Sequence, residues 1–139
     1  MKSIDQYTHV ILIGIGGIGM SGLARYFNQK NLIVLGYDRT ETELTKALHS
    51  EGIEVFHSEK KLIKVIQDEK QKALIIYTPA ISKNSELVNH FKSKGLELLK
   101  RSVVLGEITK HLPTLAVAGT HGKTTTSAIL THILKANGI

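Results

Sequence analysis

Two glycine-rich segments have the residue types and spacing to hold phosphate groups. In the first, Gly14, Gly16 and Gly19 form the pattern G-x-G-x-x-G. The first glycine permits a tight turn, the second lets the backbone approach a pyrophosphate, and the third lets a helix pack against a strand. Asp38 follows about 20 residues later, where a carboxylate can accept hydrogen bonds from ribose hydroxyls. The segment predicts a site for a diphosphate-bearing nucleotide, with NAD, FAD and a UDP-sugar all open. In the alternative, the glycines serve packing alone and Asp38 caps a turn.

The second segment, Gly119-Thr120-His121-Gly122-Lys123-Thr124, has the parts of a triphosphate loop. It is shorter than G-x-x-x-x-G-K-[ST], which would need a glycine where Val117 stands. The two glycines allow amides to point at phosphates, while Lys123 brings a cation to the β- and γ-oxygens. Thr124 offers a hydroxyl to Mg²⁺, and His121 either touches phosphate or faces solvent. The segment therefore predicts a nucleoside triphosphate with Mg²⁺.

Each loop needs a strand before it and a helix after it, and the sequence supplies both. Met20, Leu23, Ala24 and Phe27 recur at the spacing of one helical face. Runs that are apolar on both faces are typical of a parallel sheet, and repeated β–α alternation gives right-handed crossovers. We predict an α/β fold, a Rossmann-like doubly wound parallel sheet. The predicted strands are 9–14, 32–38, 53–56, 73–78, 96–99 and 115–119, and the helices after the first are 41–50, 60–69, 84–94, 101–111 and 123–137.

Composition narrows the class of protein. The 139 residues are 42% hydrophobic and 22% charged, as in a soluble globular chain. No apolar run approaches the ~20 residues that span a bilayer. The N-terminal segment lacks the apolar region of a signal peptide, so we expect a cytoplasmic protein. The absence of cysteine excludes disulfides and thiolate metal sites. A net charge of +6 without basic–aromatic alternation favours a small polyanionic ligand over nucleic acid. The charged segment 59–72 is predicted to be the solvated face of an amphipathic helix.

A domain boundary is predicted near the end of the chain. The segment 110–114 holds one of only two prolines and precedes the strand that leads into the second loop. We therefore expect one domain over residues 1–112 and the opening of another over residues 113–139. The alternative is an ordinary loop within one continuous sheet.

Both glycine segments resemble those of the Mur ligases, the ATP-dependent amide-forming enzymes of peptidoglycan synthesis. The loop "GTHGKTTT" (119–126) is similar to the ATP signature of that family. The segments 14–24, 36–38, 79–87 and 100–108 are similar to those of the members that join L-alanine to UDP-N-acetylmuramate. Members that recycle murein tripeptide usually have a different first loop, and they remain the alternative within the family.

The sequence departs from the family pattern at several positions. Tyr37 replaces the usual serine, and Thr78-Pro79 stands where Ser-Ser is common. Ser85 replaces a proline, and His57 follows Phe56 where the family has glycine. These changes affect side-chain contacts to the nucleotide and leave the backbone cradle in place.

The resemblance implies a three-domain ligase in which ATP phosphorylates the muramoyl carboxylate and the amine of L-alanine displaces the phosphate. It implies ATP and Mg²⁺ as cofactors, with Lys123 and Thr124 as catalytic residues and Thr124 as the Mg²⁺ contact through ATP. The implied ATP contacts are Gly119, Thr120, His121, Gly122, Lys123, Thr124 and Thr125. The implied UDP-sugar contacts are Gly14, Ile15, Gly16, Gly17, Ile18, Gly19, Met20, Asp38, His57, Thr78, Ala80 and Arg101.

On this interpretation the chain holds the UDP-sugar domain and the first strand, loop and helix of a P-loop ATP-binding domain. The rest of the ATP domain and the amino-acid domain would follow in the same polypeptide, so the 139 residues alone should not ligate. Two rival hypotheses come from other classes: an NAD-binding redox or sensor module, and a non-catalytic nucleotide-binding domain. The second loop disfavours the NAD module, because a nicotinamide-binding domain has no use for a triphosphate loop.

Overall fold

The structure, a computed structural model, describes residues 6–66, 73–82 and 84–138. The chain divides into two compact units, residues 1–107 and 108–139, and each is described by itself. The predicted domain boundary after residue 112 stays a prediction.

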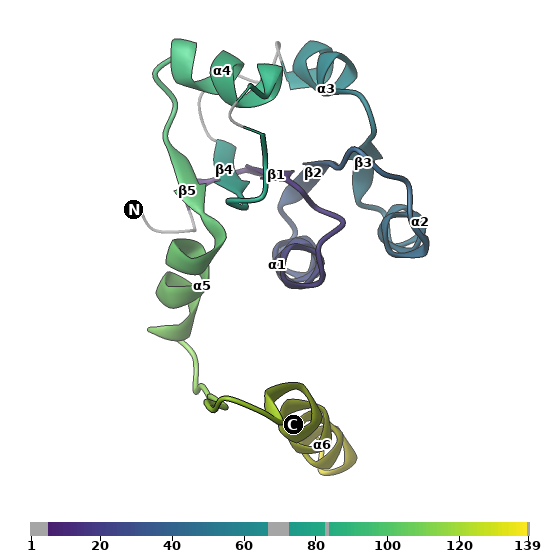
Figure 1. Cartoon of the computed structure of the whole chain (residues 1–139), viewed down its shortest axis with the longest axis vertical. Coiled ribbons are helices and arrows are strands. Elements are labelled where there is room, and N and C mark those ends of the chain that lie inside the picture. The colour runs from purple at the N-terminus through teal and green to yellow at the C-terminus, as the bar shows by residue number, and fades with distance from the viewer. Residues whose placement is uncertain (1–5, 67–72, 83, 139) are drawn as a thin grey trace. The chain divides into compact units, whose positions relative to one another are not determined.

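A five-stranded parallel sheet forms the centre of the first unit, which confirms the predicted Rossmann-like α/β fold. Its strand order is β3-β2-β1-β4-β5, so the chain begins in the middle, builds outward to one edge and then crosses to the other (Figure 1). The strands are β1 (His9–Ile13), β2 (Ile33–Tyr37), β3 (Glu54–Phe56), β4 (Ala73–Tyr77) and β5 (Leu98–Lys100). The first five predicted strands all form, with bounds that differ by at most two residues.

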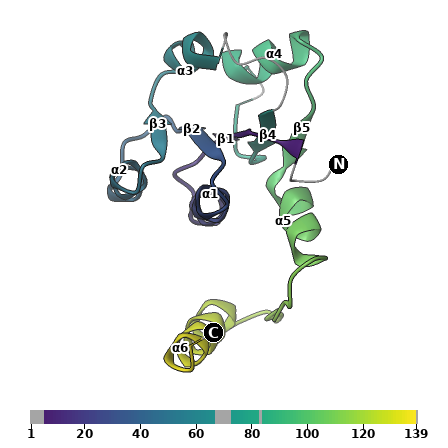
Figure 2. The ribbon, with the colours of Figure 1, turned by 180° about the vertical axis from the view of Figure 1, so that it is seen from behind.

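Helices cover both faces of this sheet. The helices α1 (Ile18–Gln29) and α2 (Glu43–Ser50) lie on one face, and α3 (Glu59–Ile66) and α4 (Glu86–Ser93) lie on the other (Figures 1 and 2). The helix α5 (Arg101–Thr109) follows β5. Every predicted helix is present, although residues 67–69 of the predicted third helix lie outside the described residues. None of the helices in the described ranges is long and apolar enough to cross a membrane.

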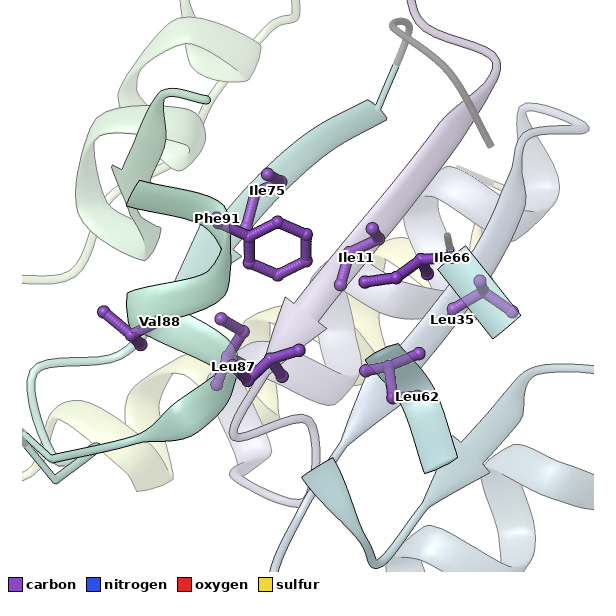
Figure 3. Close-up of a cluster of buried hydrophobic side chains, with 9 residues drawn as sticks. Ile11, Leu35, Leu62, Ile66, Ile75, Leu87, Val88 and Phe91 are labelled. Carbon is purple, nitrogen blue, oxygen red and sulfur yellow. The ribbon is translucent and has the colours of Figure 1, made fainter. Parts of the chain in front are cut away.

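Apolar side chains fill the space between the sheet and each helical layer. On the α1 face, Met20, Leu23, Ala24 and Phe27 are buried, as their helical spacing predicts. On the opposite face the strands pack against α3 and α4 in one cluster (Figure 3). Because β1, β2 and β4 bury both faces, their sequences read as continuous apolar runs. The cluster comprises Ile11, Ile13, Leu35, Leu62, Ile66, Ile75, Leu87, Val88 and Phe91.

The second unit contains the predicted helix, α6 (Lys123–Ala136), but the prediction of a strand over 115–119 is wrong. A strand forms only when a neighbour accepts and donates its ladder hydrogen bonds, and the described residues of this unit supply no other strand. Leu115 is accordingly 65% exposed. The described part of α6 buries no residue, and Ile129 and Ile133 are both more than half exposed.

Candidate nucleotide-binding site

The carboxyl ends of all five strands lie in one row. Ile13 pairs with Tyr37 on one side and Tyr77 on the other, and these rows continue to Phe56 and Lys100. The residue that follows each strand is therefore carried to the same edge of the sheet, where ligands of open α/β sheets bind. These five residues were all predicted as site residues: Gly14, Asp38, His57, Thr78 and Arg101.

A pocket of about 510 Å³ opens at this edge. Eight predicted residues line it: Gly14, Gly17, Gly19, Met20, Asp38, Thr78, Ala80 and Arg101. Five other lining residues were not predicted: Tyr37, Arg39, Glu59, Ile81 and Ser82. All five lie within two residues of a predicted one, so proximity to a strand end was the signal that could have found them. Four predicted residues, Ile15, Gly16, Ile18 and His57, are not part of the lining.

The first half of the glycine loop is held by the protein itself. The N–H groups of Gly14 and Ile15 both donate to the Tyr37 carbonyl oxygen, at 2.7 and 3.0 Å. The Gly16 N–H donates to Asp38 Oδ2 at 2.8 Å. The Ile15 side chain is fully buried and packs onto Gly36, where no Cβ could fit. These three residues shape the loop, and their amides already have acceptors.

The second half of the loop leaves amides available at the start of α1. In the described part of the chain, the N–H groups of Ile18 and Gly19 have no acceptor. They belong to the first turn of α1, where the helix dipole favours an anion. Arg101 lies against the same turn, because a Cβ on Gly19 would stand only 2.5 Å from Arg101 Nη1. Two amides without an acceptor in the described residues and a guanidinium thus lie at the start of α1, where a helix can bind a phosphate group.

Two glycines of the loop are required by their surroundings. Gly14 has a positive φ of +88°, and a Cβ there would lie 2.6 Å from the Thr78 methyl group. A Cβ on Gly16 would lie 2.7 Å from Asp38 Oδ2. The immediate reason for a glycine at position 16 is therefore the Asp38 carboxylate.

Asp38 connects three loops. Its Oδ2 accepts from the Gly16 N–H, and its Oδ1 accepts from the Thr40 N–H at 3.2 Å. Its carbonyl oxygen lies 2.8 Å from His57 Nδ1. Because a carbonyl only accepts, Nδ1 of His57 carries the proton. Asp38 was predicted to hold ribose hydroxyls; each carboxylate oxygen keeps a second lone pair for that purpose. His57 does not line the pocket and is linked to it by this bond to the Asp38 backbone.

The pocket combines charges of both signs. Arg39 and Arg101 bring cations, and Asp38 and Glu59 bring carboxylates. Burial first, and the Glu59 carboxylate second, raise the pKa of Tyr37 above its ordinary value, while a hydrogen bond from Arg39 acts in the opposite direction. The Tyr37 phenol is therefore neutral at physiological pH and can donate a hydrogen bond.

Both glycines of the second loop have backbone conformations that favour glycine, and the phosphate site predicted there stays a prediction. Gly119 and Gly122 have positive φ values of +151° and +74°, and Gly122 is the N-cap of α6. Lys123 Nζ donates to the carbonyl oxygens of Gly119 and Thr120, at 2.7 and 3.2 Å. His121 Nδ1 lies 3.2 Å from the Thr120 hydroxyl oxygen. The Lys123 side chain thus turns back toward its own loop, and its ammonium group bonds two carbonyl oxygens of that loop.

The residues around the second loop fit a nucleotide-bound Mg²⁺ better than a protein-bound metal. Within the described ranges no group of three or more His, Cys, Asp or Glu side chains could hold a metal ion. The Thr124 hydroxyl alone would contact the ion, and Mg²⁺ is commonly held by phosphates and water with one or two protein oxygens.

Comparison with known proteins identifies the family. Residues 9–112 match the family described as Mur ligase family, catalytic domain. The UDP-N-acetylmuramate–L-alanine ligase of Christiangramia forsetii is 49% identical over 99% of this chain and 31% of its own length. That of Cytophaga hutchinsonii is 50% identical over 94% of this chain and 28% of its own length.

Solved structures agree. The UDP-N-acetylmuramate–alanine ligase of Thermotoga maritima has a TM-score of 0.80 at 30% identity and covers 91% of this chain. A murein peptide ligase of Psychrobacter arcticus has a TM-score of 0.81 at 27% identity and covers 94%. The chain spans 29% and 27% of these two proteins, a share similar to that of the curated relatives. The match over residues 9–112 covers most of the sequence, and the chain therefore belongs to the Mur ligase family.

Proposed function

We propose that the chain is the N-terminal part of a ligase that joins L-alanine to UDP-N-acetylmuramate in peptidoglycan synthesis. Its first unit binds the UDP-sugar. The observation that carries this proposal is the start of α1, where the amides of Ile18 and Gly19 have no acceptor in the described residues and where Gly19 and Arg101 line the same pocket. As for the family, we expect a cytoplasmic location.

The pyrophosphate of the substrate is assigned to the start of α1. Its oxygens would accept from the Ile18 and Gly19 amides, and Arg101 would neutralise part of their charge. A guanidinium can donate two parallel hydrogen bonds to a phosphate, which a lysine at this position could not do. Arg101 follows the edge strand β5, far from the loop in sequence, so only the folded sheet brings the two together.

The nucleoside is assigned to the part of the pocket beyond Asp38. In this fold the acid at the end of the second strand faces the ribose. The free lone pairs of Asp38 would accept from ribose hydroxyls, while Thr78 and Ala80 line the same pocket. His57 would keep Asp38 in place through its backbone carbonyl.

The second loop is assigned to ATP, within a domain of which this chain carries only the loop and α6. Lys123 would exchange its own loop carbonyls for the β- and γ-phosphate oxygens, and Thr124 would hold Mg²⁺ on the nucleotide. The ion would neutralise charge on the transferred phosphoryl group. Formation of the muramoyl acyl phosphate and its displacement by the amine of L-alanine need the rest of the polypeptide, so the 139-residue chain alone should be inactive.

Two alternatives differ in their ligand. A ligase that recycles murein tripeptide shares the fold, since the murein peptide ligase of Psychrobacter arcticus has a TM-score similar to that of the alanine ligase. The first loop, "GIGGIGMSGLA" (14–24), favours the L-alanine ligase. An NAD-binding module would use the same loop, but it leaves the second loop without a role.

Calorimetric titration of the chain with UDP-N-acetylmuramate, UDP, NAD and ATP tests the proposal. We expect the UDP-sugar to bind, NAD not to bind, and ATP to bind weakly. Arg101→Ala should weaken UDP-sugar binding roughly tenfold or more, the loss expected for one charge-assisted contact. Arg25→Ala is the matched control, because Arg25 lies on α1, pairs with Glu51 at the end of α2 and does not line the pocket.

Two results would overturn the proposal. The first is tight NAD binding with no response to the UDP-sugar. The second, which concerns the missing domains, is turnover of ATP that depends on L-alanine with the 139-residue chain alone.

A further inference from the structure

Both oxygens of the Glu59 carboxylate lie at the start of a helix other than its own. The Ser85 hydroxyl donates to Glu59 Oε1 at 2.9 Å, and the Leu87 N–H donates to Oε2 at 2.9 Å. The Ser85 oxygen in turn accepts from the Val88 N–H at 3.2 Å. The first residue of α3 thus caps α4, together with the local N-cap Ser85, which is only 4% exposed.

The local cap alone would suffice for an ordinary helix. A serine N-cap typically bonds one amide of the first turn and leaves the others to solvent. Here Leu87 donates its amide to a side chain 28 residues earlier in the chain. The additional bond fixes the start of α4 to the start of α3, which an ordinary cap does not do.

The segment that leads into α4 forms one wall of the pocket. Thr78, Ala80, Ile81 and Ser82 all line it. At its first end the segment is held where the Thr78 methyl group meets Gly14, and by a bond from the Ile81 N–H to the Thr78 carbonyl oxygen at 3.1 Å. At its other end it is held where Ser85 meets Glu59. The wall is therefore fixed at both ends.

The Ser82 end of the wall lines the pocket together with Arg39 and Glu59. A second pocket of about 320 Å³ shares Arg39, Glu59 and Ser82 with the first, so the two adjoin at that end. Since α1 and Arg101 take the pyrophosphate and Asp38 takes the ribose, the part beyond Asp38 remains for the rest of the nucleoside. Loosening this wall would affect that half of the ligand and spare the phosphates.

We propose that Glu59 is a positioning residue, which holds the Thr78–Ser82 wall in place for the nucleoside through the start of α4. The inference rests on the proposed UDP-sugar site. Glu59 acts by geometry, so its charge is not needed: a glutamine at this position can accept from the Leu87 amide with its oxygen and donate its amide to the Ser85 hydroxyl.

Binding of three ligands to three variants separates this role from a general loss of stability. Glu59→Ala should weaken the binding of UDP-N-acetylmuramate and of UDP roughly tenfold and leave the binding of inorganic pyrophosphate unchanged. Glu59→Gln should bind all three as the unchanged chain does. Ser85→Ala removes one of the two hydrogen bonds between Glu59 and α4. It should weaken the binding of the two nucleotides and leave the binding of pyrophosphate unchanged. Glu43→Ala is the control, because Glu43 also begins a helix but bonds Lys46 on its own turn and links no second helix among the described residues.

Hydrogen exchange supplies a readout that needs no ligand. In Glu59→Ala, amides of residues 84–88 should exchange faster, while those of α1 should not change.

The possible failures are distinguishable. A chain that does not bind UDP-N-acetylmuramate would overturn the proposed function and this inference with it. Three other results would overturn this inference alone: unchanged nucleotide binding in Glu59→Ala, an equal loss for pyrophosphate, or tighter nucleotide binding in Glu59→Gln, which would mean that Glu59 acts on the phosphates by charge.

Discussion

Gly16→Ala should destabilise the first unit through a clash with Asp38. A Cβ at position 16 would stand 2.7 Å from Asp38 Oδ2, 2.9 Å from its Cγ and 3.2 Å from Thr45 Cγ2. The carboxylate cannot swing away freely, because the same oxygen accepts the Gly16 N–H. Thr45 is buried and blocks the other side. The loop must therefore shift, or the bond to Asp38 must break.

The two outcomes have similar energies. Overpacking of this kind costs about 1–3 kcal/mol, and a hydrogen bond to a charged group is worth about 1.5–3 kcal/mol. Since breaking the bond relieves the clash, the terms do not add, and the expected loss is about 2 kcal/mol. For a domain of this size the melting temperature should fall by roughly 10 °C.

Thermal unfolding of four variants, followed by circular dichroism, tests this reasoning. Gly22→Ala is the control: Gly22 lies within α1 with nothing within 4 Å of its Cβ position, so alanine should stabilise by about 0.5–1 kcal/mol. Asp38→Ala removes both clashing atoms. In that background Gly16→Ala should cost less, with a coupling energy of about 1 kcal/mol or more. Two results would refute the role given to Asp38. One is a Gly16→Ala substitution that costs the same free energy of unfolding with and without Asp38→Ala, and the other is equal melting temperatures for Gly16→Ala and Gly22→Ala.

Three further predictions follow from the same structure. Gly19→Ala should leave the melting temperature almost unchanged but weaken UDP-N-acetylmuramate binding roughly tenfold in calorimetry, because its Cβ would displace only the flexible end of Arg101. Gly36→Ala should lower the free energy of unfolding in urea by about 3 kcal/mol, since its Cβ would enter the buried Ile15 side chain, and Ile15→Ala should rescue part of that loss. Burial lowers the pKa of His90 below 6.5, so the unfolded chain takes up the proton first and stability should fall as the pH drops from neutral through that value. His90→Gln should flatten this slope in melting temperatures compared between neutral and mildly acidic pH.

The sheet was predictable because each of its strands is marked in the sequence by a run that is apolar on both faces. The run at 115–119 is equally apolar but forms no strand in the structure. Apolar character therefore predicts where a strand can form, and pairing decides whether it does. Leu115 and its neighbours lack the second strand that the interior runs find beside them.

The site was predictable where chemistry followed a strand end. Asp38 was expected at the end of the second strand and Arg101 from the family resemblance, and the parallel sheet brings both to one edge because its carboxyl ends lie together. The bonds of Glu59 could not be predicted, because it begins a segment whose charges indicate a solvated helix face, and only tertiary packing brings it to Ser85 and Leu87. The internal use of the Gly16 amide was equally hidden, because a motif does not say which of its amides already have acceptors.

Because Asp38 joins three loops, the lengths of those loops are coupled. Surface connections usually accept inserted residues without harm. Here one added residue between β1 and α1, or between β3 and α3, would pull Gly16 or His57 away from an anchor that the other loops still hold. Homologous chains can change length more freely in the turns at the amino ends of the strands, for example at the turn around Asn31 that joins α1 to β2. Insertions and tags for engineering belong there.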